Sequence, residues 1–155
     1  MRRSRAAIAL LVLGGVVAGT AGAAAPPAVK PVTVVGKTHL DTVVSPLVLQ
    51  DKGTVKGSPI GSADVVLRYT LKPAAGMTSV TYTMTNASGT VTGTALARYS
   101  TNNLVITFTG RAAFTSGTGA YAGIKAPTLQ FNAKHSITGK REAIAFTGRA
   151  TIPRS

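Results

Sequence analysis

The chain has no cysteine, no tryptophan and only four acidic residues among its 155. Without cysteine no disulfide framework is available, so the fold depends on packing and hydrogen bonds. The four carboxylates, Asp41, Asp51, Asp64 and Glu142, are isolated from one another in the sequence, and Glu142 lies in the turn-like stretch GKRE. This spacing disfavours a hydrolase with paired carboxylates. A nucleophilic serine is equally unsupported, because the sequence contains no G-x-S-x-G motif.

Basic residues are plentiful by contrast: 17 lysines and arginines give a formal net charge of +13. They occur singly or in short groups along the chain, and aromatic residues make up only 5%. This pattern does not predict nucleic acid as a partner. It favours a charge that keeps the protein soluble, or a general attraction to anionic cell-wall polymer or lipid headgroups.

The N-terminus has the pattern of a secretory signal peptide. The basic stretch MRRSR precedes the apolar run AAIALLVLGGVVAG, and Ala21-Gly22-Ala23 fits the A-x-A cleavage pattern. A membrane anchor over residues 6–25 is disfavoured by the paired glycines and by the lack of a charged stop-transfer flank. We therefore expect a secreted protein cleaved after Ala23, with a flexible lead-in over 24–30 and a single domain over 31–155. Loss of the three leader arginines leaves 14 basic residues against four acidic ones, a net charge of +10.

Alternation of apolar and polar residues predicts an all-β fold. In SVTYTMT the side chains of Val80, Tyr82 and Met84 share one face, and the intervening serine and threonines share the other. Turn-forming stretches such as ASG and STNN separate several of these segments. About eight strands are expected, over residues 31–44, 46–50, 63–71, 79–85, 90–99, 103–114, 128–135 and 143–152.

A short internal repeat favours a closed antiparallel β-barrel over a β-sandwich. FTGRAAF at 108–114 recurs as FTGRATI at 146–152, with a weaker copy, VTGTALA, at 91–97. Each copy places a glycine on the apolar side of its strand, where the strand can bend sharply or pass close to packed neighbours. Closed barrels need such glycines at their corners, whereas a sandwich explains them less well.

The glycines of FTSGTGAYAGIKAP look at first like a phosphate-binding loop. Gly119 to Gly123 is one residue too long for a dinucleotide fingerprint, and the following segment, which contains Pro127, is a predicted strand. Without a helix N-terminus, the loop has no row of free N–H groups to hold a phosphate. We instead expect Gly117, Gly119 and Gly123 to form a tight structural connection, with Tyr121 anchoring it against the end of the barrel.

The segment GTGAYAG resembles the signature shared by plant dirigent proteins and allene-oxide-cyclase-like barrels, including secreted bacterial members. The resemblance extends through SPIGSADVVLRYT and TFTGRAAFTSGTG and covers roughly residues 58–152. It implies an eight-stranded antiparallel barrel with an apolar lumen, often oligomeric in plants. It also implies one of two activities, the steering of a radical coupling or the cyclisation of a reactive epoxide.

Two sets of residues are candidates for a site. Five aromatic residues on the apolar faces either fill the barrel or line a cavity for a small ligand, and the many alanines and glycines beside them favour the cavity. These are Tyr69, Tyr82, Phe108, Phe131 and Phe146. His39, Asp41 and His135 form the second set, a candidate proton-relay or metal group in the lumen. The favoured interpretation of that set is an ordinary solvated strand face plus one histidine at the barrel mouth, so no metal and no cofactor are predicted.

The sequence therefore predicts a protein that binds a small apolar molecule in its lumen, with or without control of that molecule's reaction. The enzyme alternative is an isomerase or cyclase with His39 or Asp41 as acid or base. A non-enzymatic cationic surface protein that adheres to anionic cell-wall polymer is the third class. The sequence leaves homo-oligomer formation open.

Overall fold

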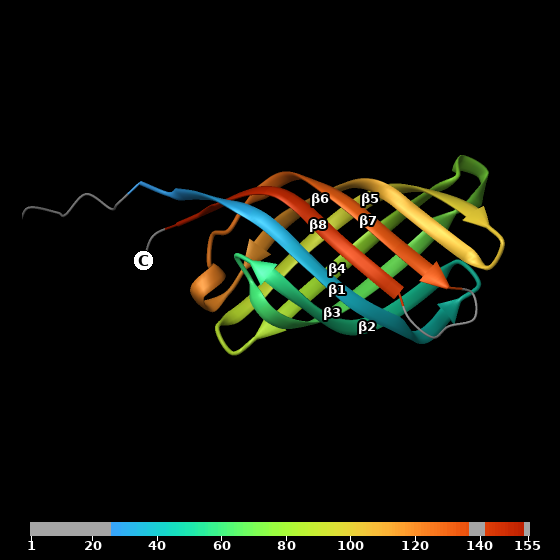
Figure 1. The fold of residues 1–155 in the computed structure, drawn as a ribbon, viewed down its shortest axis with the longest axis horizontal. Coiled ribbons are helices and arrows are strands. Elements are labelled where there is room, and N and C mark those ends of the chain that lie inside the picture. The colour runs from blue at the N-terminus through green and yellow to red at the C-terminus, as the bar shows by residue number, and fades with distance from the viewer. Residues whose placement is uncertain (1–25, 137–141, 154–155) are drawn as a thin grey trace, which may run out of the picture.

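A computed structural model describes residues 26–136 and 142–153, and these form a closed antiparallel barrel of eight strands in chain order (Figure 1). The predicted all-β class and eight-stranded barrel are thus confirmed. The signal-peptide assignment to residues 1–23 lies outside the described residues. The strands are β1 (Ala28–Ser45), β2 (Val48–Ser58), β3 (Gly61–Lys72), β4 (Met77–Asn86), β5 (Gly89–Asn102), β6 (Val105–Gly117), β7 (Ala126–Ser136) and β8 (Glu142–Ile152).

Two short 3₁₀ turns complete the described structure, η1 (Pro73–Ala75) and η2 (Gly119–Tyr121). Within the described ranges, no helix is long and apolar enough to cross a membrane.

The alternating pattern places one face of each strand in the core. On β4, Val80, Tyr82 and Met84 are buried, and β3 and β7 alternate in the same way. The strand boundaries differ most at β2, where the prediction covered 46–50 and the strand continues to Ser58. Its C-terminal half, DKGTVKGS, has a single large apolar residue and so gives little hydrophobic signal. Pairing with β1 and β3 on both sides defines the strand there.

The repeat glycines lie where strands approach their neighbours closely. A side chain at Gly93 would overlap the ring of Tyr82 and the carbonyl oxygen of Ala113, and one at Gly110 would overlap the backbone of β5. A register shift of the β5–β6 pair falls between Thr92 and Gly93. Close approach at these glycines, with an irregular register beside Gly93, is what closure of a small barrel requires.

One end of the barrel, which carries the described termini, is closed by the connection between β6 and β7. Tyr121 is buried there, and its hydroxyl donates a hydrogen bond of 2.7 Å to the carbonyl oxygen of Ile60. The Asn86 amide in turn donates to the Tyr121 hydroxyl at 2.9 Å. Gly119 and Gly123 both have positive φ, at 59° and 75°, the conformation for which glycine is favoured. The glycine-rich stretch is therefore a structural plug.

The opposite end, here called the mouth, contains the turns of the β1–β2, β3–β4 and β5–β6 hairpins (Figure 1). Inward-facing apolar side chains near this end are only partly buried, unlike those at mid-barrel. This mouth ring consists of Leu49, Leu71, Tyr99 and Ile106. The barrel interior is thus more open at the mouth than at the plugged end.

Candidate functional site at the barrel mouth

Three ionisable side chains meet inside the barrel near the mouth: Asp51 of β2, His135 of β7 and Glu142 of β8. Their strands lie on a continuous part of the wall, because β1 pairs with both β2 and β8, and β8 pairs with β7. All three residues are inward-facing and buried, with Asp51 completely inaccessible and Glu142 3% exposed. We refer to them as the acid–base group.

The register explains why these residues converge. Asp51 lies opposite Leu40 of β1, and Glu142 lies opposite Thr38, two residues earlier on the same strand. His135 follows Lys134, the last residue of β7 that pairs with β8 in the described structure. The three side chains consequently reach the same level of the barrel, although 84 positions in the sequence separate Asp51 from His135.

Glu142 is the central member of the group. His135 Nδ1 contacts Glu142 Oε1 directly, and the Thr38 hydroxyl donates a hydrogen bond of 3.2 Å to Glu142 Oε2. His135 Nδ1 lies farther, 3.9 Å, from Asp51 Oδ2. Glu142 therefore orients the imidazole through one ring nitrogen, as carboxylates do in catalytic histidine pairs. No hydrogen bond within the described part of the chain engages the other ring nitrogen, Nε2.

Asp51 is buried without the contacts that normally compensate a buried carboxylate. Neither of its side-chain oxygens has a hydrogen-bond partner within the described ranges. Burying an ionised group costs several kcal/mol unless its lone pairs are satisfied, and apolar residues in such positions often give a more stable protein. The carboxylate of Asp51 is therefore a poor contribution to stability.

The pKa values of the two carboxyl groups shift in opposite directions. Burial, together with the neighbouring Glu142 charge, raises the pKa of Asp51 to about 7. Burial also acts to raise the pKa of Glu142, but its interactions with His135, Asp51 and Thr38 outweigh burial and lower that pKa below the usual value. At neutral pH Glu142 therefore carries the negative charge, while Asp51 holds a proton for part of the time.

The same contacts stabilise the charged form of the histidine. Interactions with Asp51 and Glu142 raise the pKa of His135 to about 9 despite its burial. Tyr69, on the neighbouring β3, has its pKa raised well above the usual range, by burial first and then by the charges of Asp51 and Glu142. The phenol thus remains neutral while the group beside it changes protonation state.

Aromatic side chains occupy the middle of the barrel in mutual contact. Ring centroids lie 5.1 Å apart for Tyr69 and Phe108, 4.8 Å for Tyr82 and Phe146, and 5.2 Å for Phe131 and Phe146. Each of these five side chains is almost completely buried. Because these rings are buried against one another, the accessible apolar surface near the acid–base group comes from the mouth ring rather than from the centre of the barrel. A direct contact of the five aromatics with a ligand stays a prediction.

A small pocket reaches the acid–base group from the side. It has a volume of about 290 Å³ and is lined by Lys37, Val105, Lys134, Ser136, Glu142 and Ala143. In the described structure the pairing of β7 with β8 ends at Lys134 and Ala143, which both line this pocket. Glu142 is the one member of the acid–base group among its lining residues.

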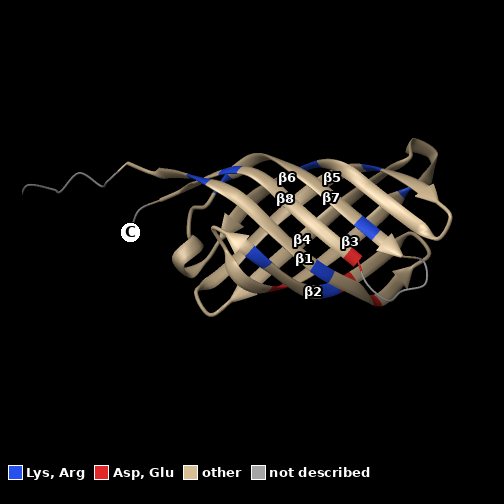
Figure 2. Cartoon of the chain, viewed as in Figure 1, with Lys and Arg blue, Asp and Glu red and all other residues tan. Residues whose placement is uncertain are grey.

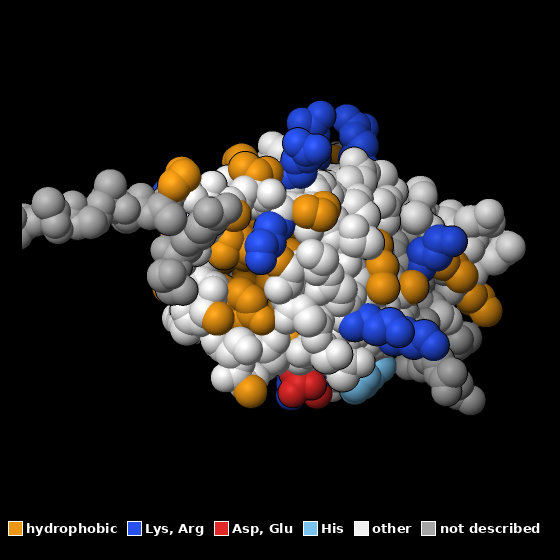
Figure 3. Space-filling model, turned by 60° about the vertical axis from the view of Figure 1, so that its left-hand side comes forward, with side chains coloured by type: hydrophobic (Ala, Val, Ile, Leu, Met, Phe, Trp, Pro, Cys, Tyr) orange, Lys and Arg blue, Asp and Glu red, His pale blue; other side chains and the backbone are white. Residues whose placement is uncertain are grey.

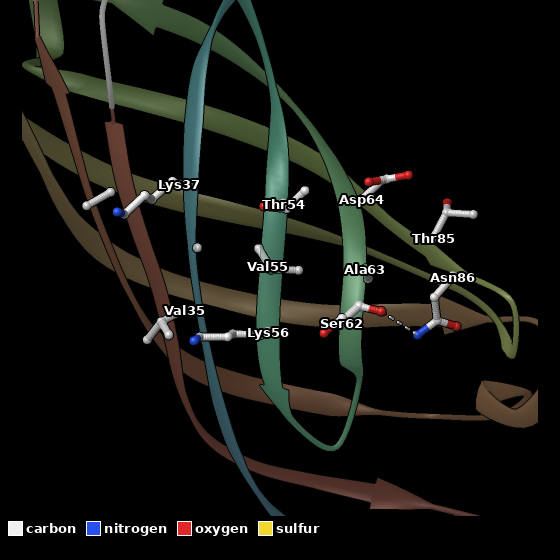
Figure 4. A pocket seen from close by; sticks show the side chains of 12 residues that line it. Val35, Lys37, Thr54, Val55, Lys56, Ser62, Ala63, Asp64, Thr85 and Asn86 are labelled. Carbon is white, nitrogen blue, oxygen red and sulfur yellow. Dashed lines mark hydrogen bonds between the residues drawn. The ribbon is translucent and has the colours of Figure 1, made fainter.

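A larger, shallow groove of about 790 Å³ crosses the outer face of β1, β2 and β3 (Figure 4). Lys37 and Lys56 border it, and Thr54, Ser62 and Asn86 add hydroxyl and amide groups. None of the acid–base group lines this groove. It therefore carries no recognisable reactive chemistry.

Two of the three residues predicted as a relay do not reach the lumen. His39 and Asp41 are exposed on the outside of the barrel, apart from His135. Asp41 accepts a hydrogen bond of 3.0 Å from the Gln50 amide and pairs with Lys52 Nζ at 3.1 Å. Their alternation with buried Thr38 directs them outward, so they lie on a solvated strand face, as the favoured interpretation expects.

Asp51 and Glu142 were missed as site residues. The prediction treated the carboxylates as isolated and assigned Glu142 to a turn, whereas Glu142 is the first residue of β8. Its parity with the apolar Ile144 and Phe146 was an available signal. Asp51 shares the parity of Leu49 and could have been noticed once β2 was extended beyond residue 50.

One oxygen or nitrogen atom from each of Asp51, His135 and Glu142 lies within 4.8 Å of the other two, so the group has the composition of a metal site. The direct contact of His135 Nδ1 with Glu142 Oε1 does not fit this use. Two ligands of one tetrahedral zinc ion lie about 3.3 Å apart, given metal–ligand distances of about 2.0–2.1 Å. The geometry of this contact therefore favours acid–base chemistry over metal binding.

Fold and site together define a closed eight-stranded antiparallel barrel with an ionisable group in its interior wall. A comparison with family models, curated proteins and solved structures finds no match to this chain.

Proposed function

We propose that the protein binds a small, predominantly apolar molecule at the barrel mouth and exchanges a proton with it, in the manner of an isomerase or cyclase. The observation that carries the proposal is the convergence of Asp51, His135 and Glu142 from three strands in a buried wall, with no hydrogen bond to either Asp51 oxygen in the described structure. A fold that needed only stability would not bury two carboxylates there.

The geometry suggests separate roles for the three residues. Glu142 contacts His135 through Nδ1, which leaves Nε2 of the protonated imidazole to donate a proton to the ligand. Asp51 accepts or returns the second proton, since its pKa of about 7 allows both protonation states near neutral pH. Proton removal at one atom and return at another is the chemistry of an isomerisation or ring closure.

The surroundings favour an apolar ligand with one polar group. The mouth ring of Leu49, Leu71, Tyr99 and Ile106 supplies apolar surface, while the acid–base group supplies the polar contact. Pockets of this kind use a few polar groups to orient a mainly apolar molecule. The resemblance of GTGAYAG to the dirigent and allene-oxide-cyclase signature supports the same substrate class. We further propose a secreted protein, in line with the leader-like N-terminus.

Native mass spectrometry of the protein purified from its own host tests the binding step. We expect an excess mass of a few hundred daltons that disappears on denaturation. Ile106→Trp should fill the mouth and remove this mass, whereas Leu96→Trp, on the outer face of β5, should leave it unchanged. An adduct that survives Ile106→Trp, or no adduct and no binding of the uncharged probe N-phenyl-1-naphthylamine, would contradict binding at the mouth.

The proton-transfer step is tested with the ligand that native mass spectrometry identifies. Incubation in D₂O should place deuterium on a carbon of the ligand or its product in the presence of the wild-type protein. Asp51→Asn and Glu142→Gln should reduce this incorporation at least about 100-fold, typical of losing an acid–base catalyst, with binding retained. The exposed Asp41→Asn is the matched control. Incorporation that is equal in all variants would limit the protein to ligand binding.

The cationic surface provides a second candidate function, adhesion to anionic cell-wall polymer. Two of the four carboxylates are buried in the acid–base group, so the described exterior carries eleven basic residues against two acidic ones, Asp41 and Asp64. Figure 2 marks the basic residues at separate places along the strands, and Figure 3 shows basic side chains at several places on the face in view. Adhesion of this kind should fall steeply between low and physiological salt, whereas apolar ligand binding should change little.

A further inference from the structure

Exposed apolar side chains gather at the mouth. Nine large hydrophobic residues are exposed within the described ranges, and five of them lie in or beside two hairpin turns at this end. These five are Val43, Val44 and Leu47 of the β1–β2 hairpin and Leu104 and Val105 of the β5–β6 hairpin. Leu104 and Val43 are each 57% exposed. The other turn at the mouth described in full, η1, consists of proline and alanine and is also exposed.

The opposite end of the barrel differs. Its turns are rich in glycine, serine, alanine and proline, and their large apolar residues, Ile60, Tyr121 and Ile124, are all buried. Within the described chain, Val29 near the N-terminus of β1 is the only exposed large hydrophobic residue at that end. We call the five exposed apolar residues of the β1–β2 and β5–β6 hairpins the apolar tips. Such exposed residues are therefore a property of the mouth rather than of barrel turns in general.

Basic side chains lie on the strand segments behind these tips. Lys52, Lys72, Arg98 and Lys134 are all exposed near the mouth ends of their strands. The single exposed acidic residue in this region of the described structure, Asp41, is paired with Lys52. We call these four basic residues the basic collar. Exposed apolar residues next to a group of basic residues are the arrangement that proteins use to insert into the interface of an anionic bilayer.

We propose that the mouth docks on an anionic lipid surface, with the β1–β2 and β5–β6 tips inserted between headgroups and the basic collar against the phosphates. A second copy of the chain is a poorer occupant, because two strongly basic exteriors repel each other. A soluble anionic polymer would use the collar but not the apolar tips. The docking does not depend on what the mouth binds or on any reaction there.

Vesicle co-sedimentation tests the docking directly. The chain beginning at Ala24 is suitable, since all eight strand pairings lie within residues 28–152 and the apolar leader is removed. We expect it to bind vesicles of phosphatidylglycerol and phosphatidylcholine at least about 10-fold more strongly than pure phosphatidylcholine, with binding reduced by salt. Equal binding to both vesicles, or none to either, would overturn the proposal.

Substitutions at the tips separate insertion from simple charge attraction. Leu47→Ser with Leu104→Ser should lower the partition coefficient about 10-fold or more, because two apolar side chains no longer enter the interface. Val29→Ser with Leu96→Ser is the matched control, as these side chains are 61% and 52% exposed but lie away from the mouth. The control should retain wild-type binding. An equal effect of both pairs would overturn the proposal.

Two further outcomes would also overturn it. If the apolar tips instead form an interface between two copies of the chain, analytical ultracentrifugation without lipid would show a dimer. The double substitution Leu47→Ser with Leu104→Ser would then dissociate this dimer. Dextran sulfate binding as strong as vesicle binding and insensitive to these substitutions would identify a polymer-binding surface. The ligand adduct in native mass spectra is measured without vesicles, so failure of docking leaves the proposed function unaffected, and the reverse also holds.

Discussion

Asp51, His135 and Glu142 determine how protonation affects stability. Each is inside an otherwise apolar barrel, and together they hold fewer hydrogen bonds than their polar atoms can accept. A buried group whose pKa shifts on folding makes the free energy of unfolding depend on pH. Stability measurements therefore report on these residues even before a ligand is known.

The first prediction is that the free energy of unfolding falls as the pH rises from 5 to 9. The pKa of Asp51 is raised from 3.8 to about 7, so the folded protein favours its neutral form and loses stability as the pH rises through this range. The pKa of His135 is raised from 6.5 to about 9, so its contribution is complete below pH 6.5 and is lost as the pH rises through 9. Glu142 acts in the opposite direction, but in acid, where its lowered pKa makes stability fall as the pH decreases. Tyr69 stays neutral throughout.

Urea unfolding at several pH values measures this loss, which we expect to be on the order of 3 kcal/mol between pH 5 and 9. Asp51→Asn should remove part of the pH dependence and stabilise the protein at pH 9 by roughly 1–3 kcal/mol, because a neutral amide replaces a poorly solvated carboxylate. Asp41→Asn is the control at an exposed carboxylate. A flat profile, or destabilisation of Asp51→Asn at pH 9, would show that the group is solvated.

At the scale of the strand, the glycines of the repeat determine how closely neighbouring strands pack. Gly93 faces the ring of Tyr82, whose hydroxyl donates a hydrogen bond of 2.8 Å to the Ala113 carbonyl oxygen across the β4–β5–β6 sheet. A methyl group at position 93 would occupy the place of both the ring and the carbonyl. The repeated position is thus fixed by lack of space.

We therefore expect Gly93→Ala to lower the free energy of unfolding by about 2–4 kcal/mol, through overpacking and loss of the Tyr82 hydrogen bond. Gly61→Ala should cost only about 1 kcal/mol, because it meets no atom within 4 Å and is strained solely by its φ of 77°. Thermal and urea unfolding measure both variants. Equal costs would mean that Tyr82 can move aside freely.

The existence of the strands was largely predictable from the sequence, but the residues at which some of them end were not. Val65, Leu67 and Tyr69 of β3 follow an alternation that determines which face is buried. The second half of β2 has almost no apolar alternation, because hydrogen bonds with two neighbouring strands hold it in place. Asp51 lies in this part of the molecule, and so the carboxylate most informative about function was overlooked.

At the scale of the whole molecule, the barrel has two different ends. The plug around Tyr121 closes one, while the mouth combines the acid–base group, the half-buried apolar ring and the exposed hairpin tips. His135 was predictable as an inward-facing residue from its parity in TLQFNAKH. Its partners were not, because only closure of the barrel brings β8 against β1 and places Glu142 opposite Thr38.

The account also predicts that the folded protein needs no metal ion. Dialysis against EDTA should leave the melting temperature unchanged, since Glu142 and His135 contact each other directly and stabilise each other's charged form. Differential scanning calorimetry with and without EDTA and added Zn²⁺ measures this. A melting temperature that falls by several degrees in EDTA and recovers with Zn²⁺ would show that the three residues form a metal site instead.

The central claim is that Glu142 and Asp51 hold a proton on His135 inside the barrel, and an NMR titration of the two histidines tests it most directly. His39→Gln identifies which signal belongs to His135. The account predicts that His135 titrates with a pKa of about 9, and that Glu142→Gln lowers this pKa because it removes the contacting charge. A pKa at or below 6.5 that does not respond to Glu142→Gln would contradict the acid–base group and the function proposed from it.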